Sequence, residues 1–187
     1  MNPKELHFDQ EGREKLLEGI TLMSRAVKST LGPSGHTVMM ESPNHTKGMT
    51  ITKDGVTVAK NFDIEDPVAN LAVGLMKEAA DRTAISAGDG TTTAIVLTEA
   101  IIKNGMSFLD KNKDMNVNMF IKEIQEISND VIKSLDKSSK KVSGKTLRDV
   151  ATISANNDRY LGDMIASAYD KIGVNGKITV ENSHTEK

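Results

Sequence analysis

Apolar side chains recur every three to four residues over most of this chain, the spacing of a helix with one buried face. The first such stretch follows Asp9, a residue type suited to capping a helix, and its apolar stripe runs from Leu16 to Val27. It stops at a loop with two glycines and a proline. The other long helices are expected from Pro67, capped by Asp66, to the loop at Gly88, from Thr91 to Asn104 with Gly105 closing it, and from Val117 to Leu135.

Two short β-like runs flank a segment rich in turn-forming residues. They are His36–Glu41 and Met49–Thr52, and together they predict a hairpin with a long tip. Isolated strands are expected at Glu5–Phe8 and Ile178–Val180, and a turn at Lys53–Gly55.

A change of composition marks the last quarter of the chain. Asp136–Lys141 is polar, cationic and poor in apolar residues, which is typical of a domain boundary or hinge. Beyond it, the pattern at Leu147–Ala151 indicates a short helix, and Asn157 is placed to cap another that ends at Gly173. The pattern as a whole predicts a mainly α fold with one hairpin.

Composition narrows the class of protein. The 187 residues are 37% hydrophobic, 3% aromatic and 27% charged, with a net charge of −2. This describes a soluble globular chain with no basic footprint for nucleic acid and no apolar run of membrane-spanning length. No cysteine is present, which excludes disulfides and thiolate metal sites. Met1–Gln10 has neither signal nor transit character, so a cytoplasmic location is expected.

The stretch Gly88–Thr93 carries the clearest chemistry. Two glycines bracket Asp89, three threonines follow, and a helical pattern starts at once. Glycines allow close approach of backbone N–H groups, and a helix N-terminus favours anions. A carboxylate within such a phosphate cradle requires an accompanying cation, of which Mg²⁺ is the usual one. The local interpretation is a site for a metal–nucleotide complex.

Other nucleotide and metal motifs are incomplete. The full P-loop pattern, Gly-x-x-x-x-Gly-Lys-Ser/Thr, does not occur. The dinucleotide fingerprint would need a glycine at Thr93 and a strand before it. Asp110–Asp114 resembles the start of a calcium loop, but Met115 and Ile121 stand where the turn glycine and the bidentate acid belong.

Two further loops have the composition to approach a ligand. Gly32–Gly35 follows a helix end, and Thr52–Gly55 places a cation and a carboxylate on one turn. Taken singly, each is more often a surface turn, and residue order does not show that they meet.

Four motifs occur in order along the chain: Val27–Pro33, Ile51–Gly55, Ala87–Ala94 and Ala151–Asn156. In order and spacing they resemble the group I chaperonins, the GroEL family. The resemblance implies the N-terminal half of a helical, ATP-binding equatorial domain with a β-hairpin stem-loop over residues 1–136. It further implies the first segment of a small α+β intermediate domain over residues 137–187, so the chain would represent about the first third of a family member.

The resemblance also implies roles for individual residues. Asp54 would assist hydrolysis by placing the attacking water, and Asp89 would ligate Mg²⁺. Lys53 would lie at the phosphates beside a K⁺ site. The remaining nucleotide-binding residues would be Thr30, Leu31, Gly32, Pro33, Gly55, Gly90, Thr91, Thr92, Thr93, Ile153 and Ser154.

Two functions from different classes follow. In the first, the chain is part of an ATP-driven chaperone whose homo-oligomeric ring, heptameric by resemblance, folds non-native client proteins with or without a co-chaperonin lid. Thr37–Thr52 would pair with a neighbouring subunit, and the printed residues alone would have negligible ATPase activity. In the second, the chain is a truncated, non-catalytic module that binds nucleotide or docks onto chaperonin rings.

Overall fold

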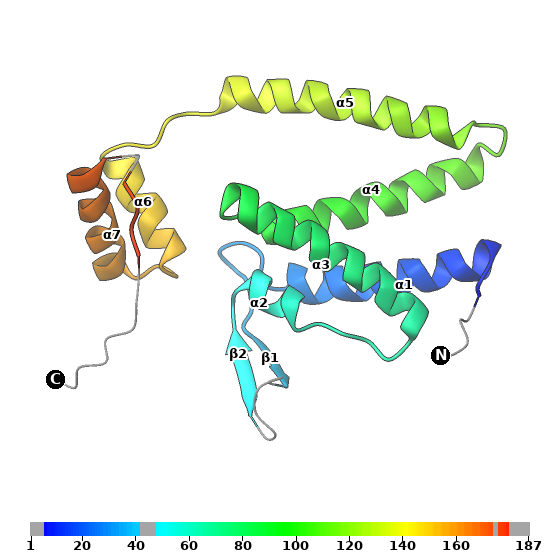
Figure 1. The fold of residues 1–187 in the computed structure, drawn as a ribbon, viewed down its shortest axis with the longest axis horizontal. Coiled ribbons are helices and arrows are strands. Elements are labelled where there is room, and N and C mark those ends of the chain that lie inside the picture. The colour runs from blue at the N-terminus through cyan, green and yellow to red at the C-terminus, as the bar shows by residue number, and fades with distance from the viewer. Residues whose placement is uncertain (1–5, 42–47, 174–175, 180–187) are drawn as a thin grey trace. The chain divides into compact units, whose positions relative to one another are not determined.

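The computed structural model describes residues 6–41, 48–173 and 176–179, and the described part contains seven helices and one hairpin. The chain divides into two compact units, Met1–Val117 and Asn118–Lys187, and each is described by itself. Figure 1 labels the elements. They are α1 (Asp9–Lys28), β1 (Val38–Glu41), β2 (Met49–Thr52), α2 (Gly55–Lys60), α3 (Pro67–Ala87), α4 (Thr91–Lys111), α5 (Val117–Ser138), α6 (Lys145–Ser154) and α7 (Arg159–Ile172).

The core of the first unit lies between α1, α3 and α4, with the short α2 packed at one end (Figure 1). It contains no aromatic side chain among its fully buried members, so methionine and β-branched residues fill the space between the helices. The buried members are Ile20, Met23, Val27, Val58, Ala59, Ala72, Val73, Met76, Ala80 and Ile95.

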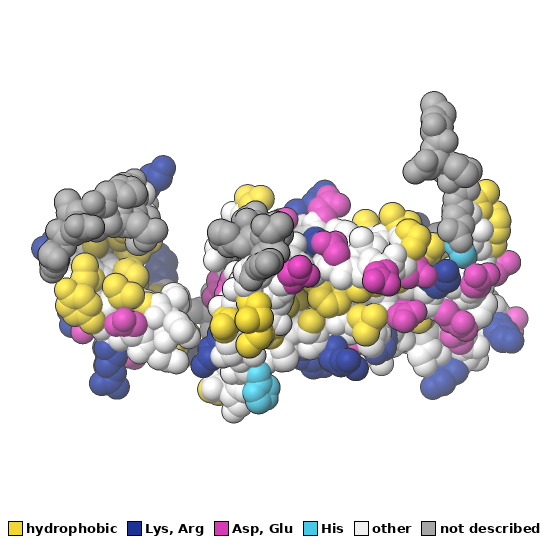
Figure 2. Space-filling view, turned by 90° about the horizontal axis from the view of Figure 1, so that it is seen from below, with side chains coloured by type: hydrophobic (Ala, Val, Ile, Leu, Met, Phe, Trp, Pro, Cys, Tyr) yellow, Lys and Arg dark blue, Asp and Glu magenta, His cyan; other side chains and the backbone are white. Residues whose placement is uncertain are grey.

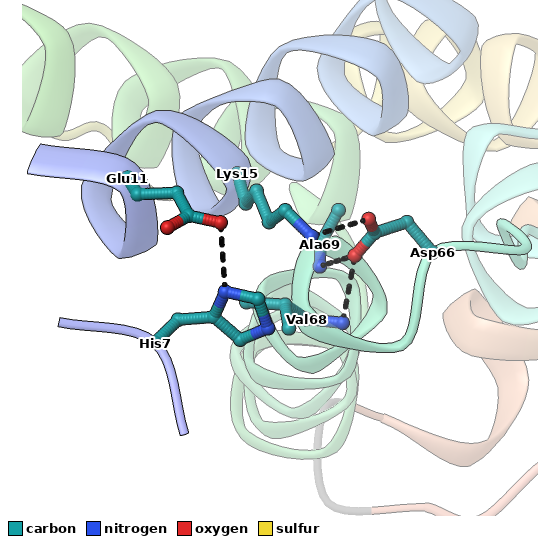
Figure 3. Close-up of polar contacts among 6 residues, drawn as sticks. All are labelled: His7, Glu11, Lys15, Asp66, Val68 and Ala69. Carbon is teal, nitrogen blue, oxygen red and sulfur yellow. Dashed lines mark hydrogen bonds and ion pairs between the residues drawn. The ribbon is translucent and has the colours of Figure 1, made fainter. Parts of the chain in front are cut away.

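The start of α3 is fixed by a carboxylate, as the sequence predicts. Asp66 accepts hydrogen bonds from the backbone N–H groups of Val68 and Ala69 at 2.8 and 2.9 Å. Lys15 of α1 forms an ion pair with its other oxygen at 3.1 Å (Figure 3). The hydrogen bond from Ala69, followed by the contact with Lys15, lowers the pKa of Asp66. One side chain therefore caps α3 and ties it to α1.

The hairpin is confirmed, with Val38 opposite Thr52 and Glu41 opposite Met49 in an antiparallel ladder. Side chains alternate between a half-buried and an exposed face along both strands. The predicted long tip falls within residues 42–47, outside the described residues.

The second unit contains α5, α6 and α7. The helices α6 and α7 pack closely at Gly162, which is buried. A β-carbon at this position would overlap the side chain of Thr152. Ala151 and Ala166 are the buried apolar residues of this pair. The apolar stripe predicted for α5 does form on a helix, but none of its side chains is buried.

Several predicted helix boundaries are wrong. Asp9 does not cap α1: it lies inside the first turn at φ +52°, and Phe8 occupies the cap position. Gly105 does not close its helix, because α4 continues to Lys111 and packing at Ile102 and nearby residues outweighs the low helix propensity of glycine. Asn157 has φ +66°, so it cannot adopt the extended backbone of an N-cap, and the next residue, Asp158, caps α7 instead.

Other elements also differ from the sequence prediction. Lys53–Gly55 leads into a helix, α2, rather than a simple turn. The described parts of the two isolated strands, Leu6–Phe8 and Ile178–Thr179, form no strand, since a strand needs a neighbour to complete its ladder. Glu5 and Val180 lie outside the described residues.

The apolar spacing of α3 predicts one buried stripe, but the buried face of the helix is rotated from it, so that only Ala72 and Met76 of the stripe are in the core. The predicted stripe consists of Val68, Leu71, Ala72, Leu75, Met76 and Ala79. Leu71 and Leu75 are 66% and 68% exposed, whereas Ala69, Val73 and Ala80 are buried. Figure 2 shows hydrophobic side chains at the surface between acidic and basic ones. In the part of the chain that the structure describes, no helix has the length and apolar character to span a membrane.

Candidate functional site

Gly55 is the point at which three sequence-distant loops of the first unit meet. This glycine is buried, and a β-carbon placed on it would overlap the hydroxyl oxygen of Thr92 and lie 3.0 Å from that of Thr30. Thr30 follows α1, Gly55 begins α2, and Thr92 is in the first turn of α4. The sequence pattern identified these three loops separately, and the structure shows that they lie together.

The α1 loop is held in a compact form by its own backbone. Thr30 N–H and Thr30 Oγ1 both bond to the carbonyl of Val27, at 3.1 and 2.7 Å. His36 N–H then closes the loop onto the carbonyl of Ser29 at 2.7 Å. Gly32 has φ +78°, a left-handed conformation that side chains rarely adopt. Leu31, Gly32 and Pro33 are exposed within this closed loop.

Asp54 is the N-cap residue of α2. Its carboxylate accepts from the N–H of Val56 at 3.2 Å and the N–H of Thr57 at 3.0 Å. Thr57 Oγ1 also donates to it at 2.6 Å, and Asp54 N–H donates to Thr52 Oγ1 at 3.0 Å. These bonds fix the orientation of an exposed carboxylate. The sequence prediction missed Thr57 and the helix itself, although Asp is a residue type that commonly caps a helix N-terminus.

The α3–α4 connection consists of Gly88, Asp89 and Gly90. The two glycines have φ +76° and +89°, so neither position suits a side chain. Gly90 is the cap residue of α4 and supplies no side-chain acceptor, so the first N–H groups of this helix have no partner from the cap. A helix N-terminus of this kind is suited to bind an anion.

Thr91 shows that the beginning of α4 has unmet hydrogen-bonding capacity. Its side chain is 2% exposed, and Oγ1 has no hydrogen-bond partner among the described residues. Buried hydroxyls are normally paired, since an unpaired one costs about 1–3 kcal/mol. Thr93, two residues on, is exposed.

Asp89 fits a role as a metal ligand, although it forms no metal centre alone. Its Oδ1 accepts from the N–H of Gly90 at 2.6 Å, which orients the exposed carboxylate beside the N-terminus of α4. The described residues contain no cluster of three or more His, Cys, Asp or Glu side chains that could hold a metal ion. Mg²⁺ is commonly held by one or two carboxylates plus the phosphates of a nucleotide, and Asp89 suits that arrangement.

The remaining predicted residues are placed as follows. Lys53 is exposed directly before the cap of α2. Ile153 and Ser154 are exposed at the end of α6, which belongs to the second unit. An apolar groove of about 280 Å³ between α1, α3 and α4 contains none of the predicted site residues.

Gly144, Lys145 and Thr146 match the end of the P-loop pattern and begin α6. The first glycine of that pattern would fall at position 139, where the chain has Ser139. These residues therefore do not complete a phosphate loop.

Comparison with known proteins supports the family resemblance seen in the sequence. A model of the TCP-1/cpn60 chaperonin family matches residues 23–187. Two crystal structures of the chaperonin gp146 from the bacteriophage EL 2 (Pseudomonas aeruginosa), both in the presence of ATP-BeFx, are similar. They are 29% and 28% identical to this chain, with TM-scores of 0.72 and 0.73.

In both comparisons the match covers 87% of this chain and 28% of the gp146 chain. The helical body with its small antiparallel hairpin matches the equatorial domain fold of chaperonins. The family match begins at Met23 and extends to residue 187, so it includes all four motifs. The chain therefore belongs to the TCP-1/cpn60 chaperonin family.

Proposed function

We propose that this chain forms one wall of a Mg²⁺–ATP site in a chaperonin subunit, which uses ATP hydrolysis to assist the folding of non-native proteins. The observation that carries the proposal is the meeting of Thr30, Gly55 and Thr92. Three loops with phosphate-binding character converge at a point where only a glycine leaves room. The crystallisation of the related gp146 with an ATP analogue supports the same ligand class.

Each loop has a separate task in this proposal. The N-terminus of α4, with Gly90–Thr93, donates N–H and hydroxyl groups to the phosphates, and the unpaired Thr91 Oγ1 is available for this. The α1 loop, Thr30–Pro33, lines the phosphate and sugar side through its backbone. Lys53 balances phosphate charge beside a K⁺ ion, and Asp89 holds Mg²⁺, which neutralises phosphate charge during transfer.

Asp54 is assigned to hydrolysis. Its carboxylate is already oriented by the capping bonds of α2, so it can position and polarise a water molecule without first reorganising. Ile153 and Ser154 are proposed to approach the nucleotide from the second unit. The domain division at residues 136 and 137 is part of the same proposal.

Assembly and location complete the proposal. The hairpin β1–β2 pairs with a neighbouring subunit in a homo-oligomeric, heptameric cytoplasmic ring, which acts on client proteins with or without a co-chaperonin lid. An exposed hairpin edge has unpaired backbone groups that suit such strand addition.

The experiment that tests the nucleotide site is Asp89→Asn in the full-length protein. Asparagine retains an oxygen that accepts from the N–H of Gly90 but removes the charge that holds Mg²⁺. Calorimetric titration with ATP and Mg²⁺ is expected to show at least about tenfold weaker binding, equivalent to 1.4 kcal/mol.

Asp114→Asn is the matched control, because Asp114 is an exposed carboxylate in the loop after α4. It should bind ATP like the parent. Unchanged Mg²⁺-dependent affinity in Asp89→Asn would remove the site assignment.

A further inference from the structure

A hydrogen bond joins α1 to α4 inside the first unit. Ser24 Oγ donates to Glu99 Oε2 at 2.6 Å, and the two residues are 75 positions apart in the chain. Ser24 has no exposed surface, and the Glu99 side chain is 14% exposed. A short bond to a carboxylate in such surroundings belongs to the stronger class of hydrogen bonds.

The other oxygen of Glu99 has a different partner. Lys103 Nζ lies 3.1 Å from Glu99 Oε1 one helical turn along α4. Lys28 of α1 adds a favourable charge nearby, and the hydrogen bond from Ser24 is the largest influence lowering the pKa of Glu99. Only the Ser24 contact crosses between the two helices by a hydrogen bond to Glu99. The Lys103 contact stays within α4 and thus provides an internal control.

The pair lies at a similar distance from two loops of the candidate site. Ser24 precedes Thr30 by six residues, which is about 9 Å along a helix. Glu99 follows Thr92 by seven residues, or about 10 Å. The intervening contacts between α1 and α4 are made by buried apolar side chains such as Val27 and Ile95. The hydrophobic effect has no directional preference, so the Ser24–Glu99 bond adds a directional restraint to the register that interdigitating side chains set between the two helices.

We propose that Ser24 and Glu99 are positioning residues for the nucleotide site: their hydrogen bond sets the axial position of α1 relative to α4. The hydroxyls of Thr30 and Thr92 then meet at Gly55. The inference rests on the proposed function, since it assigns these residues a task in that same site. The hydrogen-bond and ion-pair partners described for the two side chains, which are each other and Lys103, lie outside the three loops, so both residues act through the helices that carry them.

The test compares three variants in the full-length protein. Ser24→Ala removes the donor, Glu99→Gln retains an acceptor oxygen but loses the charge, and Lys103→Gln removes only the contact within α4. MgATP affinity is measured by calorimetry, and amide hydrogen exchange at residues 29–35 and 90–93 is measured without nucleotide. Ser24→Ala should weaken MgATP binding about tenfold and speed exchange in both loops. Lys103→Gln should match the parent, and Glu99→Gln should retain most of the parent affinity.

The outcomes separate this inference from the proposed function. A Ser24→Ala protein that is less heat-stable but has parental MgATP affinity and loop exchange would make the pair merely structural and overturn the inference. If the parent itself bound no MgATP, the proposed function and the inference would both fail. Should Ser24→Ala not fold, Glu99→Ala takes its place, because it removes the acceptor from the less buried side of the bond, and the same two measurements decide.

Discussion

The carbonyl oxygen of Ala69 lies within the space that a β-carbon on Gly19 would occupy. Gly19 is buried in α1, and Ala69 is buried in the first turn of α3. The two helices therefore approach each other at a point where backbone meets backbone. The Lys15–Asp66 ion pair lies one helical turn before this contact on α1.

Gly19→Ala should therefore push α1 and α3 apart. Backbone atoms cannot move aside as a flexible side chain can, so the free energy of unfolding should fall by about 1–3 kcal/mol. The matched control is Gly74→Ala, an exposed position inside α3 where nothing lies within 4 Å of the new β-carbon. It should stabilise the protein by about 0.5–1 kcal/mol. Thermal unfolding of both variants tests whether Gly19→Ala lowers the stability and Gly74→Ala raises it. Equal effects on stability would contradict the close backbone contact between α1 and α3.

Thr91→Val should separate stability from ligand binding. Valine has nearly the shape of threonine, and it removes a buried hydroxyl that has no partner among the described residues. The free energy of unfolding should rise by about 1 kcal/mol, while MgATP affinity falls. Denaturant unfolding and calorimetry measure the two quantities. Lower stability in the variant would show that the hydroxyl is paired in the folded protein.

Asp54→Asn should affect hydrolysis more than binding. Asparagine is as good an N-cap as aspartate, so α2 should still begin at Gly55. Loss of the charge should slow steady-state ATP turnover by about 10²–10⁴-fold with MgATP affinity nearly unchanged. Phosphate release assays and calorimetry on the full-length protein provide the comparison. Turnover at the parental rate would place hydrolysis elsewhere.

Asp66 should make the free energy of unfolding depend on pH. Its pKa is lowered from the ordinary value of 3.8, so the folded state binds the proton less readily than the unfolded state. Its contribution is complete above about pH 3.8 and is lost as the pH falls through the lower folded-state value. The stability difference between the parent and Asp66→Ala should therefore be constant near neutral pH and shrink in acid. Asp66→Asn, which caps without a charge, should show a pH-independent difference from Asp66→Ala.

Local signals were sufficient for much of the fold. The Asp66–Pro67 cap, the hairpin strands and the Gly173 end of α7 each depend on neighbouring residues, and all three were predictable. The rotation of the buried face of α3 depends on where α1 and α4 lie, which a single helical stripe does not contain. Leu71 and Leu75 fit the apolar period as well as Val73 does, yet they are exposed.

The candidate site also has some features that the local sequence predicts and others that depend on the packing of the helices. Asp89 and the glycines beside it were recognisable from residue type and spacing. The meeting of Thr30 and Thr92 at Gly55 was not, since it depends on three helices packing in one particular register. Ser24 gave no signal, because a lone serine in an apolar stripe has the same pattern whether or not it finds a carboxylate 75 positions away.

The three-residue connection Gly88-Asp89-Gly90 also has a consequence for the order of folding. It joins two long helices that run in opposite directions and pack side by side (Figure 1). Contacts that close so short a loop cost little chain entropy and form early. The turn proposed to bind phosphate should therefore form together with the α3–α4 helical hairpin, whereas the Thr30 loop reaches its place only when α1 docks. A refolding chain is therefore expected to form this proposed anion-binding end before it forms the rest of the pocket.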